Sequence, residues 1–166
     1  SCGVCHSDVH IHDGYFDLGG GNKLPVGQML NLPHTMGHEI EGEVAAIGPD
    51  VTDVEIGANV VAYPWIGCGE CATCKAGDEH YCNAPRQLGI QLPGGFADYC
   101  IVPDSKYVLD YTGIRPGLAA TYMCSGLTAF GALKKFVNIT DEDHILIMGL
   151  GGVGICLLYK SPRPRD

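Results

Sequence analysis

Basic residues are scarce in this chain of 166 residues. Ten lysines and arginines stand against 19 aspartates and glutamates, which gives a formal net charge of −9. Nucleic acids and anionic membranes are bound through basic patches, so we expect neither as a partner. No apolar run approaches the ~20 residues that a membrane-spanning helix needs. The first residues do not resemble a signal peptide, and the nine cysteines are an odd number. A disulfide-stabilised secreted protein is therefore disfavoured, and we expect a soluble protein of the reducing cytoplasm.

Glycine, by contrast, is abundant. The 24 glycines are about twice the usual share of ~7%, so many turns are expected. Short runs at residues 42–47, 59–63 and 96–102 are rich in Val, Ile and Tyr and are interrupted by Gly, Pro and Asp. This pattern predicts short strands joined by tight turns. The segment from about residue 39 to residue 102 is therefore expected to be β-rich.

The composition changes near residue 115. Residues 118–136 are rich in Ala, Leu, Met and Lys and lack proline, which favours a helix, although Gly126 and Gly131 weaken its continuity. Residues 144–148 then read as a buried strand, and residues 149–154 as a glycine turn that opens another helix. Residues 115–166 are therefore expected to begin an α/β arrangement.

Four cysteines follow one another in the pattern C-x2-C-x2-C-x7-C. Thiolates that converge from one short loop suit a tetrahedral zinc ion, and a closed set of four thiolates is structural. Disulfides would be a second use of the same residues, but the odd cysteine count disfavours them. An iron–sulfur site is the other alternative. Ferredoxin-type runs place the fourth cysteine three residues on and before a proline, whereas here it is seven residues on and precedes Asn83. Zinc is favoured for the following cysteines: Cys68, Cys71, Cys74 and Cys82.

A second group of possible metal ligands lies near the amino end. Residues 5–10 read Cys-His-Ser-Asp-Val-His, and residues 37–39 read Gly-His-Glu. A catalytic zinc needs three protein ligands and one open position for water or substrate. Cys5 and His38 supply two ligands, and Cys124 is the best remaining candidate for the third. A helical cysteine among apolar neighbours is more commonly a core residue, so Cys124 is weak by itself.

Taken in order, these motifs resemble the zinc-dependent medium-chain dehydrogenase/reductases of the alcohol dehydrogenase type. The resemblance covers nearly all of residues 2–156. It implies a mixed β and α/β fold, in which a GroES-like, β-rich catalytic domain at residues 1–114 lacks its N-terminal strands. The start of a Rossmann dinucleotide-binding domain follows at residues 115–166, with an atypical tail at 159–166. The motifs that carry the resemblance are Cys-His-Ser-Asp with His10, Gly-His-Glu, the cysteine run, Gly94-Gly95-Phe96-Ala97, Cys124 and Gly-Leu-Gly-Gly-Val-Gly at 149–154.

The resemblance also implies roles for single residues. Cys5, His38 and Cys124 correspond to the ligands of the catalytic zinc, and the four-cysteine run corresponds to a structural zinc site. The remaining correspondences are Glu39, a carboxylate that can approach the metal; Asp8, which orients the liganding histidine; Ser7, which hydrogen-bonds the alcohol; His10, which passes the proton on from the cofactor ribose; His6, at the cofactor pyrophosphate; and Trp65, in the substrate pocket or in ordinary packing.

The glycine turn corresponds to the cofactor site. Gly149 permits the turn, Gly151 and Gly152 leave room for the pyrophosphate, and Gly154 allows close helix packing. An acidic residue about 20 positions later normally holds the ribose, but the chain ends at Asp166. NAD and NADP therefore both remain open. We expect the chain to be a core piece of the enzyme, incomplete at both ends, and residues 13–33 to form a surface or entrance loop.

The implied activity is hydride transfer between an alcohol and NAD(P), with an aldehyde or ketone as product. Two zinc ions per complete chain and a homo-oligomer are implied as well. Two alternatives remain. The chain could be a non-catalytic zinc-binding fragment, inactive because its nucleotide domain is incomplete. A zinc-free quinone reductase of the same superfamily is disfavoured, because such relatives generally lack the cysteine run and the catalytic ligands.

Overall fold

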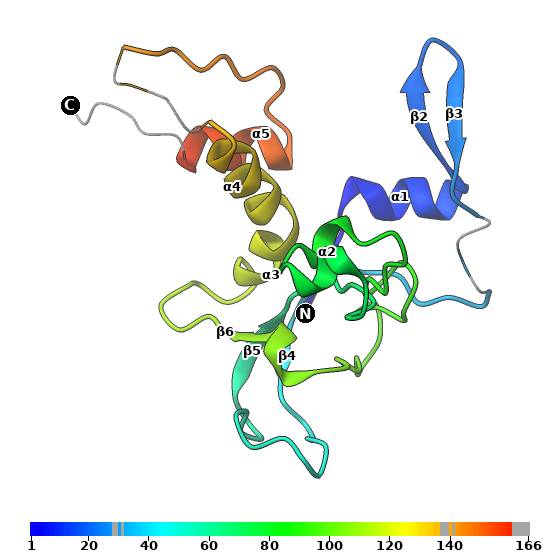
Figure 1. Cartoon of the computed structure of the whole chain (residues 1–166), viewed down its shortest axis with the longest axis vertical. Coiled ribbons are helices and arrows are strands. Elements are labelled where there is room, and N and C mark those ends of the chain that lie inside the picture. The colour runs from blue at the N-terminus through cyan, green and yellow to red at the C-terminus, as the bar shows by residue number, and fades with distance from the viewer. Residues whose placement is uncertain (28–29, 31, 137–139, 141, 161–166) are drawn as a thin grey trace. The chain divides into compact units, whose positions relative to one another are not determined.

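The computed structural model describes residues 1–27, 30, 32–136, 140 and 142–160. The chain divides into two compact units after Met123 (Figure 1). This division falls within the predicted helix 118–136, and the domain limits 1–114 and 115–166 stay a prediction. The last part of the predicted atypical tail, residues 161–166, lies outside the described residues. None of the helices among the described residues has the length and apolar character needed to cross a bilayer.

A four-stranded antiparallel sheet forms the centre of the first unit. Its strands lie in the order β1 (Cys2–Gly3), β4 (Glu39–Glu43), β5 (Asn59–Ala62) and β6 (Val108–Asp110). Residues far apart in the chain thus become direct neighbours, because Cys2 pairs with Ile40, Ile40 with Ala62 and Ala62 with Val108. The predicted strands at 42–47 and 59–63 correspond in part to β4 and β5. The sheet brings the amino end of the chain beside the segment that carries His38.

The core of this unit lies between the sheet and the loop that follows β5. A buried cluster contains Ala62, Ile66, Leu88 and Tyr107. Strand β4 also turns two carboxylates inward, because Glu39 and Glu41 are only 6% and 8% exposed. Buried charges need partners. Both oxygens of Glu41 accept a hydrogen bond from the Gly117 amide at 2.9 Å, which offsets its burial.

The predicted strand at residues 96–102 is wrong. The Phe96 amide donates a hydrogen bond to the Met36 carbonyl at 3.0 Å. The start of this segment is therefore held against residues 35–37 by backbone hydrogen bonds without forming a strand. The residues after it find no partner strand among the described residues, and Tyr99 and Ile101 are 78% and 86% exposed. Short β-branched and aromatic runs fit a pleated surface only where a neighbouring strand is available.

The segment after β1 forms helix α1 (His6–Asp13). Cys5 is its N-cap residue, and the Asp8 carboxylate accepts a hydrogen bond from the Cys5 amide at 2.9 Å, which satisfies one of the otherwise unpaired donors at the helix start. The helix ends at Gly14, whose φ of 81° is readily adopted by glycine. Residues 5–10 are therefore placed by a capped helix, with Asp8 on its buried side.

The prediction of a loop at residues 13–33 is wrong in its central part. Strands β2 (Tyr15–Gly19) and β3 (Asn22–Pro25) form an antiparallel hairpin. Three consecutive glycines, residues 19–21, all have positive φ and reverse the chain between the strands. Glycine abundance here marks a tight turn rather than a long irregular loop. Residues 28, 29 and 31 of the predicted loop lie outside the described residues.

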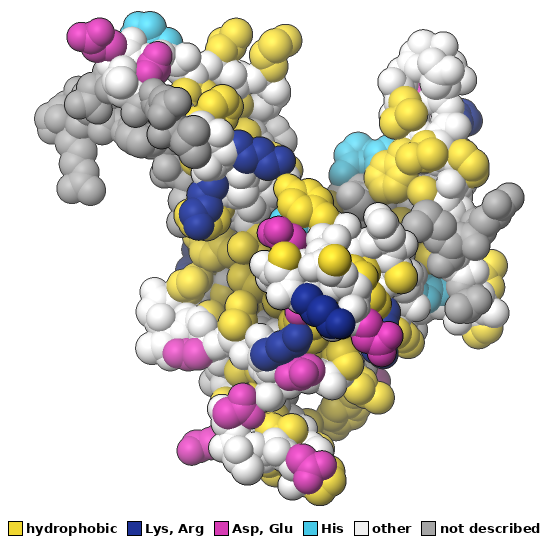
Figure 2. All heavy atoms as spheres, in the orientation of Figure 1, with side chains coloured by type: hydrophobic (Ala, Val, Ile, Leu, Met, Phe, Trp, Pro, Cys, Tyr) yellow, Lys and Arg dark blue, Asp and Glu magenta, His cyan; other side chains and the backbone are white. Residues whose placement is uncertain are grey.

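The loop after β5 carries the cysteine run and little regular structure. It contains the short helix α2 (Ala72–Lys75) and the 3-10 turn η2 (Glu79–Tyr81). A second 3-10 turn, η3 (Ser105–Tyr107), leads into β6. On the face shown in Figure 2, acidic side chains gather on the loop between β4 and β5, where Asp50, Asp53 and Glu55 are exposed.

The predicted helix at 118–136 is confirmed in three consecutive segments. They are α3 (Ala119–Thr121), a π-helical turn (Tyr122–Gly126) and α4 (Leu127–Lys134). The helix expected after the glycine turn is confirmed as α5 (Gly152–Lys160). Within the second unit, α4 and α5 pack against each other.

The predicted buried strand at 144–148 is wrong. Leu146 and Met148 are 85% and 89% exposed, and no strand is assigned there. A buried parallel strand needs hydrogen-bonded neighbours at both edges, and the described residues of the second unit contain no other strand with which to pair. The Rossmann-type sheet therefore stays a prediction, whereas the mixed fold of the first unit is observed.

Candidate metal sites and active site

The four cysteines of the run converge in space. Their sulfur atoms lie within 4.8 Å of one another. The Sγ atom of Cys71 lies 3.4 Å from that of Cys74 and 3.8 Å from that of Cys82, and the Sγ atoms of Cys68 and Cys74 are 3.9 Å apart. A tetrahedron with Zn–S bonds of about 2.3 Å has edges of about 3.8 Å. A disulfide needs about 2.05 Å, and all nine cysteines are free thiols. These sulfur separations fit a metal ion and do not match a disulfide.

Backbone amides of this loop donate hydrogen bonds to the cysteine sulfurs and so favour the thiolate form. The amides of Cys71 and Cys74 donate to the sulfurs of Cys68 and Cys71, both at 3.4 Å, and the Cys68 amide donates to the Cys82 sulfur at 3.3 Å. The Glu70 and Cys71 amides lower the pKa of Cys68 to about 6. Burial and the neighbouring thiols raise the pKa of Cys74 to about 12. Four thiolates therefore need a bound cation to coexist.

A second cluster forms where the start of α1 meets the start of β4. The ligand atoms of Cys5, His38 and Glu39 lie within 4.8 Å of one another. His38 is only 1% exposed, and within the described residues neither of its ring nitrogens has a partner of hydrogen-bond geometry. A buried imidazole nitrogen without a donor or acceptor partner is costly, and a metal ion is the partner that this set of sulfur, nitrogen and oxygen atoms fits.

The Asp8 carboxylate lies next to the Nδ1 atom of His38. Its Oδ1 atom lies 3.3 Å from His38 Nδ1, a distance that makes an ion pair although the angles do not meet those of a hydrogen bond. Burial tends to lower the pKa of His38, but the Asp8 carboxylate and the Cys5 thiol outweigh it and raise the pKa to about 9. Burial likewise tends to raise the pKa of Asp8, but His38 and the Cys5 amide lower it. Without a metal, the proton on His38 supplies the positive charge of this pocket.

Glycines bring the 94–96 segment against the backbone beside His38. A Cβ atom on Gly94 would lie 2.2 Å from the Gly37 carbonyl oxygen, and one on Gly89 would lie 2.6 Å from the same atom. Gly37 itself has a φ of 95°, which glycine adopts readily. The Gly95 amide bonds the Gly37 carbonyl at 2.8 Å. This contact explains the Gly-Gly motif, whereas the part played by Gly89 carried no recognisable signal in the sequence.

Cys124 is the first residue of the second unit. It is 7% exposed and lies in the π-helical turn, a feature frequent at functional sites. The residue before it is anchored in the first unit, because the Met123 carbonyl accepts a hydrogen bond from Trp65 Nε1 at 2.8 Å. The Trp65 ring lies 5.7 Å from the His38 ring. The peptide that leads into Cys124 is thus tied to a ring beside His38, and the role of Cys124 as third ligand stays a prediction.

The predicted relay residues lie on α1. The rings of His6 and His10 stack with centroids 4.7 Å apart, as expected for positions i and i+4 of a helix. His6 is exposed, and Ser7 and His10 are half-buried. Phe16 of the hairpin packs on His10 at 4.9 Å. Sequence reasoning missed Phe16, because nothing in a supposed loop indicated that a hairpin would fold back onto α1. The roles of Ser7, His6 and His10 stay predictions.

The glycine turn of the second unit is tightly wound. Gly149 has a φ of 91°, and a Cβ atom on Gly154 would lie 2.0 Å from the Gly149 carbonyl oxygen. A Cβ atom on Gly151 would meet no atom within 4 Å, so this part of the turn is open. Gly152 begins α5. The local geometry is compatible with the predicted cofactor turn, which stays a prediction.

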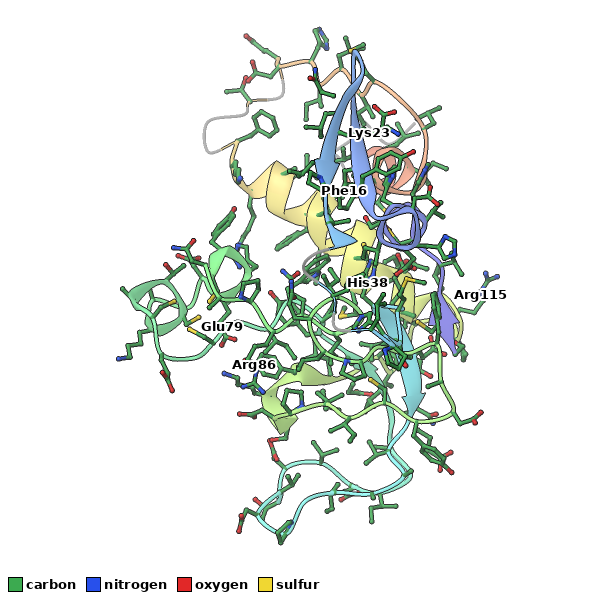
Figure 3. All side chains as sticks on the ribbon, turned by 90° about the vertical axis from the view of Figure 1, so that its right-hand side faces the viewer. Phe16, Lys23, His38, Glu79, Arg86 and Arg115 are labelled. Atoms are coloured by element: carbon green, nitrogen blue, oxygen red, sulfur yellow. The ribbon has the colours of Figure 1, made fainter. Side chains whose placement is uncertain are left out.

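Figure 3 labels His38 and Glu79, which lie on separate parts of the first unit. The two candidate metal sites have no ligand in common. One is built from a single loop, and the other from α1 and β4. Among the ion pairs of the described residues, Asp8 and His38 are the most deeply buried, at 3% and 1% exposed.

Comparison with known proteins relates this architecture to one family. The alcohol dehydrogenase GroES-like domain matches residues 1–113. The NAD-dependent alcohol dehydrogenase of Saccharolobus solfataricus is 39% identical over 153 residues, which are 92% of this chain and 43% of that protein. A probable cinnamyl alcohol dehydrogenase of Saccharum officinarum is 37% identical over 162 residues, with 92% and 41% covered. The chain thus spans about two fifths of the length of these curated relatives.

Solved structures agree with this relationship. Acetophenone reductase from Geotrichum candidum, solved in complex with NAD, superposes with a TM-score of 0.76 at 31% identity, covering 95% of this chain and 43% of that one. The cobalt- and zinc-bound alcohol dehydrogenase from Pyrobaculum aerophilum superposes with a TM-score of 0.67 at 32% identity, covering 77% and 38%. With its four-stranded sheet, its cysteine loop and the match over residues 1–113, the chain belongs to the GroES-like domain family of the medium-chain alcohol dehydrogenases.

Proposed function

We propose that this chain carries the metal-binding catalytic part of a zinc-dependent alcohol dehydrogenase that exchanges hydride between an alcohol and NAD(P). The product is an aldehyde or a ketone. One observation carries the proposal beyond family membership, namely the cluster of half-buried Cys5 with buried His38 and Glu39, where Asp8 lies next to the imidazole. The zinc- and cobalt-bound relative from Pyrobaculum aerophilum supports a metal in this family.

The proposed catalytic ligands are Cys5, His38 and Cys124. Their soft sulfur and imidazole donors suit zinc, and three protein ligands leave one position open. When bound, zinc supplies a Lewis acid for the substrate oxygen and NAD(P) supplies the hydride acceptor. Asp8 holds His38 in one tautomer and orientation. Glu39 provides a nearby carboxylate that can occupy the open coordination position of the zinc.

Helix α1 carries the proposed proton path. Ser7 is proposed to hydrogen-bond the substrate hydroxyl and to accept its proton. His10, which is half-buried and stacked on His6, is the residue that would receive this proton when the cofactor ribose is bound between Ser7 and His10. The imidazole of His10 is proposed to accept this proton and release it to water. His6 is exposed on the same helix and is proposed to face the cofactor pyrophosphate.

The cofactor is proposed to be NAD or NADP, bound at the glycine turn 149–154. The names of several relatives specify NAD, and the Geotrichum candidum reductase was solved with it. The positive φ of Gly149, the open space at Gly151 and the close packing of Gly154 on the Gly149 carbonyl support this proposal. A second, structural zinc is proposed at the four-cysteine loop. We further propose a homo-oligomeric enzyme of the cytoplasm, on family resemblance and on the free thiols.

A second candidate function is a zinc-binding chain without turnover. It is favoured by the exposure of Leu146 and Met148, because a nucleotide-binding sheet would cover both. Direct titration with NAD and NADP distinguishes the two candidates. Specific cofactor binding favours the dehydrogenase, whereas two bound zinc ions without cofactor binding favour the alternative.

Metal analysis of the purified chain tests the ligand sets. We expect about two zinc ions and no iron. Cys68→Ala and Cys5→Ala are each expected to lose one zinc, and Cys100→Ala, which changes a half-buried cysteine outside both sets, is the control. Turnover is followed as NAD(P)-linked absorbance with primary and secondary alcohols. A single zinc that disappears in Cys68→Ala would contradict the catalytic set.

A further inference from the structure

Glu79 lies on the cysteine loop, between Cys74 and Cys82, but it is not grouped with the metal ligands. Its side chain is 18% exposed, and both carboxylate oxygens are used. Oε2 accepts hydrogen bonds from the Gly67 amide, at 3.2 Å, and from the Tyr107 hydroxyl, while Oε1 accepts one from Lys106 Nζ at 2.9 Å. One carboxylate thus collects three donors from two separate segments.

These donors connect the loop with the core. Gly67 directly precedes Cys68, the first cysteine of the run. Tyr107 is 7% exposed and belongs to the buried cluster with Ile66 and Leu88. The Glu79 carboxylate therefore joins the start of the metal loop to a fixed point of the core.

The backbone of Glu79 holds the other end of the same loop. Its carbonyl accepts a hydrogen bond from the Cys82 amide at 3.0 Å. The space around Gly67 is also filled, because a Cβ atom there would lie 2.5 Å from the Cys74 sulfur and 3.1 Å from the Glu79 carbonyl oxygen. A shift of Gly67 would therefore disturb the sulfur positions directly. Glu79 touches the segments that carry the first and the last cysteine.

We propose that Glu79 is a positioning residue for the four-cysteine metal site. Its carboxylate fixes Gly67, and through it Cys68, at the distance from Cys74 and Cys82 that one ion requires. Metal retention then depends on a side chain that is not a ligand. Charge-assisted hydrogen bonds are stronger than neutral ones, so the neutral amide that Glu79→Gln introduces replaces this function poorly. The inference rests on the proposed zinc at this loop.

The test compares two variants with the same charge change. Glu79→Gln removes the charge at the junction. Glu70→Gln removes one from an exposed side chain of the same loop and keeps the Glu70 backbone amide that bonds Cys68. Both are made in a Cys5→Ala background, so that only the metal of the cysteine loop is counted. Zinc release to a chromophoric chelator is expected to be ~10–100-fold faster in Glu79→Gln and nearly unchanged in Glu70→Gln.

Cobalt substitution adds a spectroscopic readout. The intensity of the cobalt–thiolate bands reports how tetrahedral the four sulfurs are, and we expect it to change in Glu79→Gln but not in Glu70→Gln. Should Glu79→Gln fail to fold, Tyr107→Phe removes a single hydrogen bond and keeps the ring in the core. It is expected to speed release about five-fold, the equivalent of one hydrogen bond of ~1 kcal/mol.

The outcomes distinguish failure of the positioning role of Glu79 from failure of the zinc proposal. Equal release from Glu79→Gln and the parent, or equal acceleration in Glu79→Gln and Glu70→Gln, overturns the positioning role alone. Unchanged release in Tyr107→Phe, where that variant is used, does the same. A parent chain that holds no metal at these cysteines overturns the zinc proposal together with this inference.

Discussion

Replacement of Asp8 by asparagine tests the pair at the centre of the proposed catalytic site. The pair is almost fully buried, with Asp8 and His38 at 3% and 1% exposed. The pKa of His38 is about 9, compared with an ordinary value of 6.5, because the Asp8 carboxylate and the Cys5 thiol overcome the opposing effect of burial. Asparagine keeps an oxygen that can accept the Cys5 amide at the start of α1 but removes the negative charge. Burial then dominates, and the pKa of His38 falls.

The magnitude follows from linkage. One pKa unit corresponds to ~1.4 kcal/mol, so the elevation of the His38 pKa corresponds to about 3 kcal/mol of folding free energy in the metal-free protein. A raised pKa in the folded state means that this stabilisation is fully present below pH 6.5, the pKa of the unfolded chain, and is lost as the pH rises through about 9. Asp8→Asn is expected to lose most of this pH dependence. With zinc, it is expected to bind the catalytic ion about 10–100-fold more weakly.

Trp65 provides a fluorescence signal for this experiment. It is the sole tryptophan of the chain, and its ring lies 5.7 Å from that of His38. A charged imidazole quenches indole emission more strongly than a neutral one, so a pH titration of the fluorescence follows His38. Urea unfolding at pH 6 and at pH 10 measures the stability difference.

The matched control is Asp13→Asn, which makes the same change at the end of the same helix. Asp13 faces His12 at 3.4 Å, but both side chains are exposed, at 47% and 77%. Exposed pairs contribute ~0–1 kcal/mol, so this variant is expected to behave like the parent. If the fluorescence midpoint and the pH dependence of stability were the same in Asp8→Asn and the parent, the coupling of Asp8 to His38 would be refuted.

Three further predictions follow from the contacts around the site. Gly94→Ala forces a methyl group against backbone atoms of Gly37 and is expected to cost about 2–3 kcal/mol, or roughly 8–12 °C in Tm, whereas Gly42→Ala, which meets nothing within 4 Å, serves as the control in thermal unfolding. Cys124→Ala is expected to abolish turnover of the full-length enzyme and to leave the cysteine loop metallated; normal turnover with two zinc ions would remove Cys124 from the ligand set. His10→Ala is expected to lower turnover by roughly 100-fold, with recovery in external base, and an unchanged pH–rate profile would remove His10 from the proton path.

The two candidate metal sites differ in how far the sequence could predict them. The cysteine loop is local, because its four sulfurs come from residues 68–82 and the spacing alone indicates a tetrahedral set. The pocket around His38 depends on the pairing of β1 with β4, which no local pattern encodes. It was accessible only because several motifs occur in the order of a known family. The pair of Asp8 and His38 was anticipated in the same way, and its burial was not.

The errors also have physical causes. Residues 96–102 and 144–148 have strand-like composition, but a strand exists only when a neighbour supplies its hydrogen bonds. The amide at the start of the first segment donates its hydrogen bond to the irregular segment 35–37. The second segment has no described strand beside it. The hairpin was missed for the opposite reason. Its three glycines suggested irregular structure, although their positive φ values close a tight turn.

Glycine connects these observations to the chemistry. At Gly94 the missing side chain permits backbone atoms to approach to hydrogen-bonding distance beside His38, and at Gly37 it leaves room for the Phe96 ring and the Cys2 sulfur. At Gly67 the missing side chain leaves room for the Cys74 sulfur. In each case a Cβ atom would occupy space next to a proposed metal ligand. The absence of a side chain at these glycines therefore determines the position that the ligand can take. The glycine-rich composition that first suggested many turns therefore has a second physical basis, since part of it serves close packing around the two candidate metal sites.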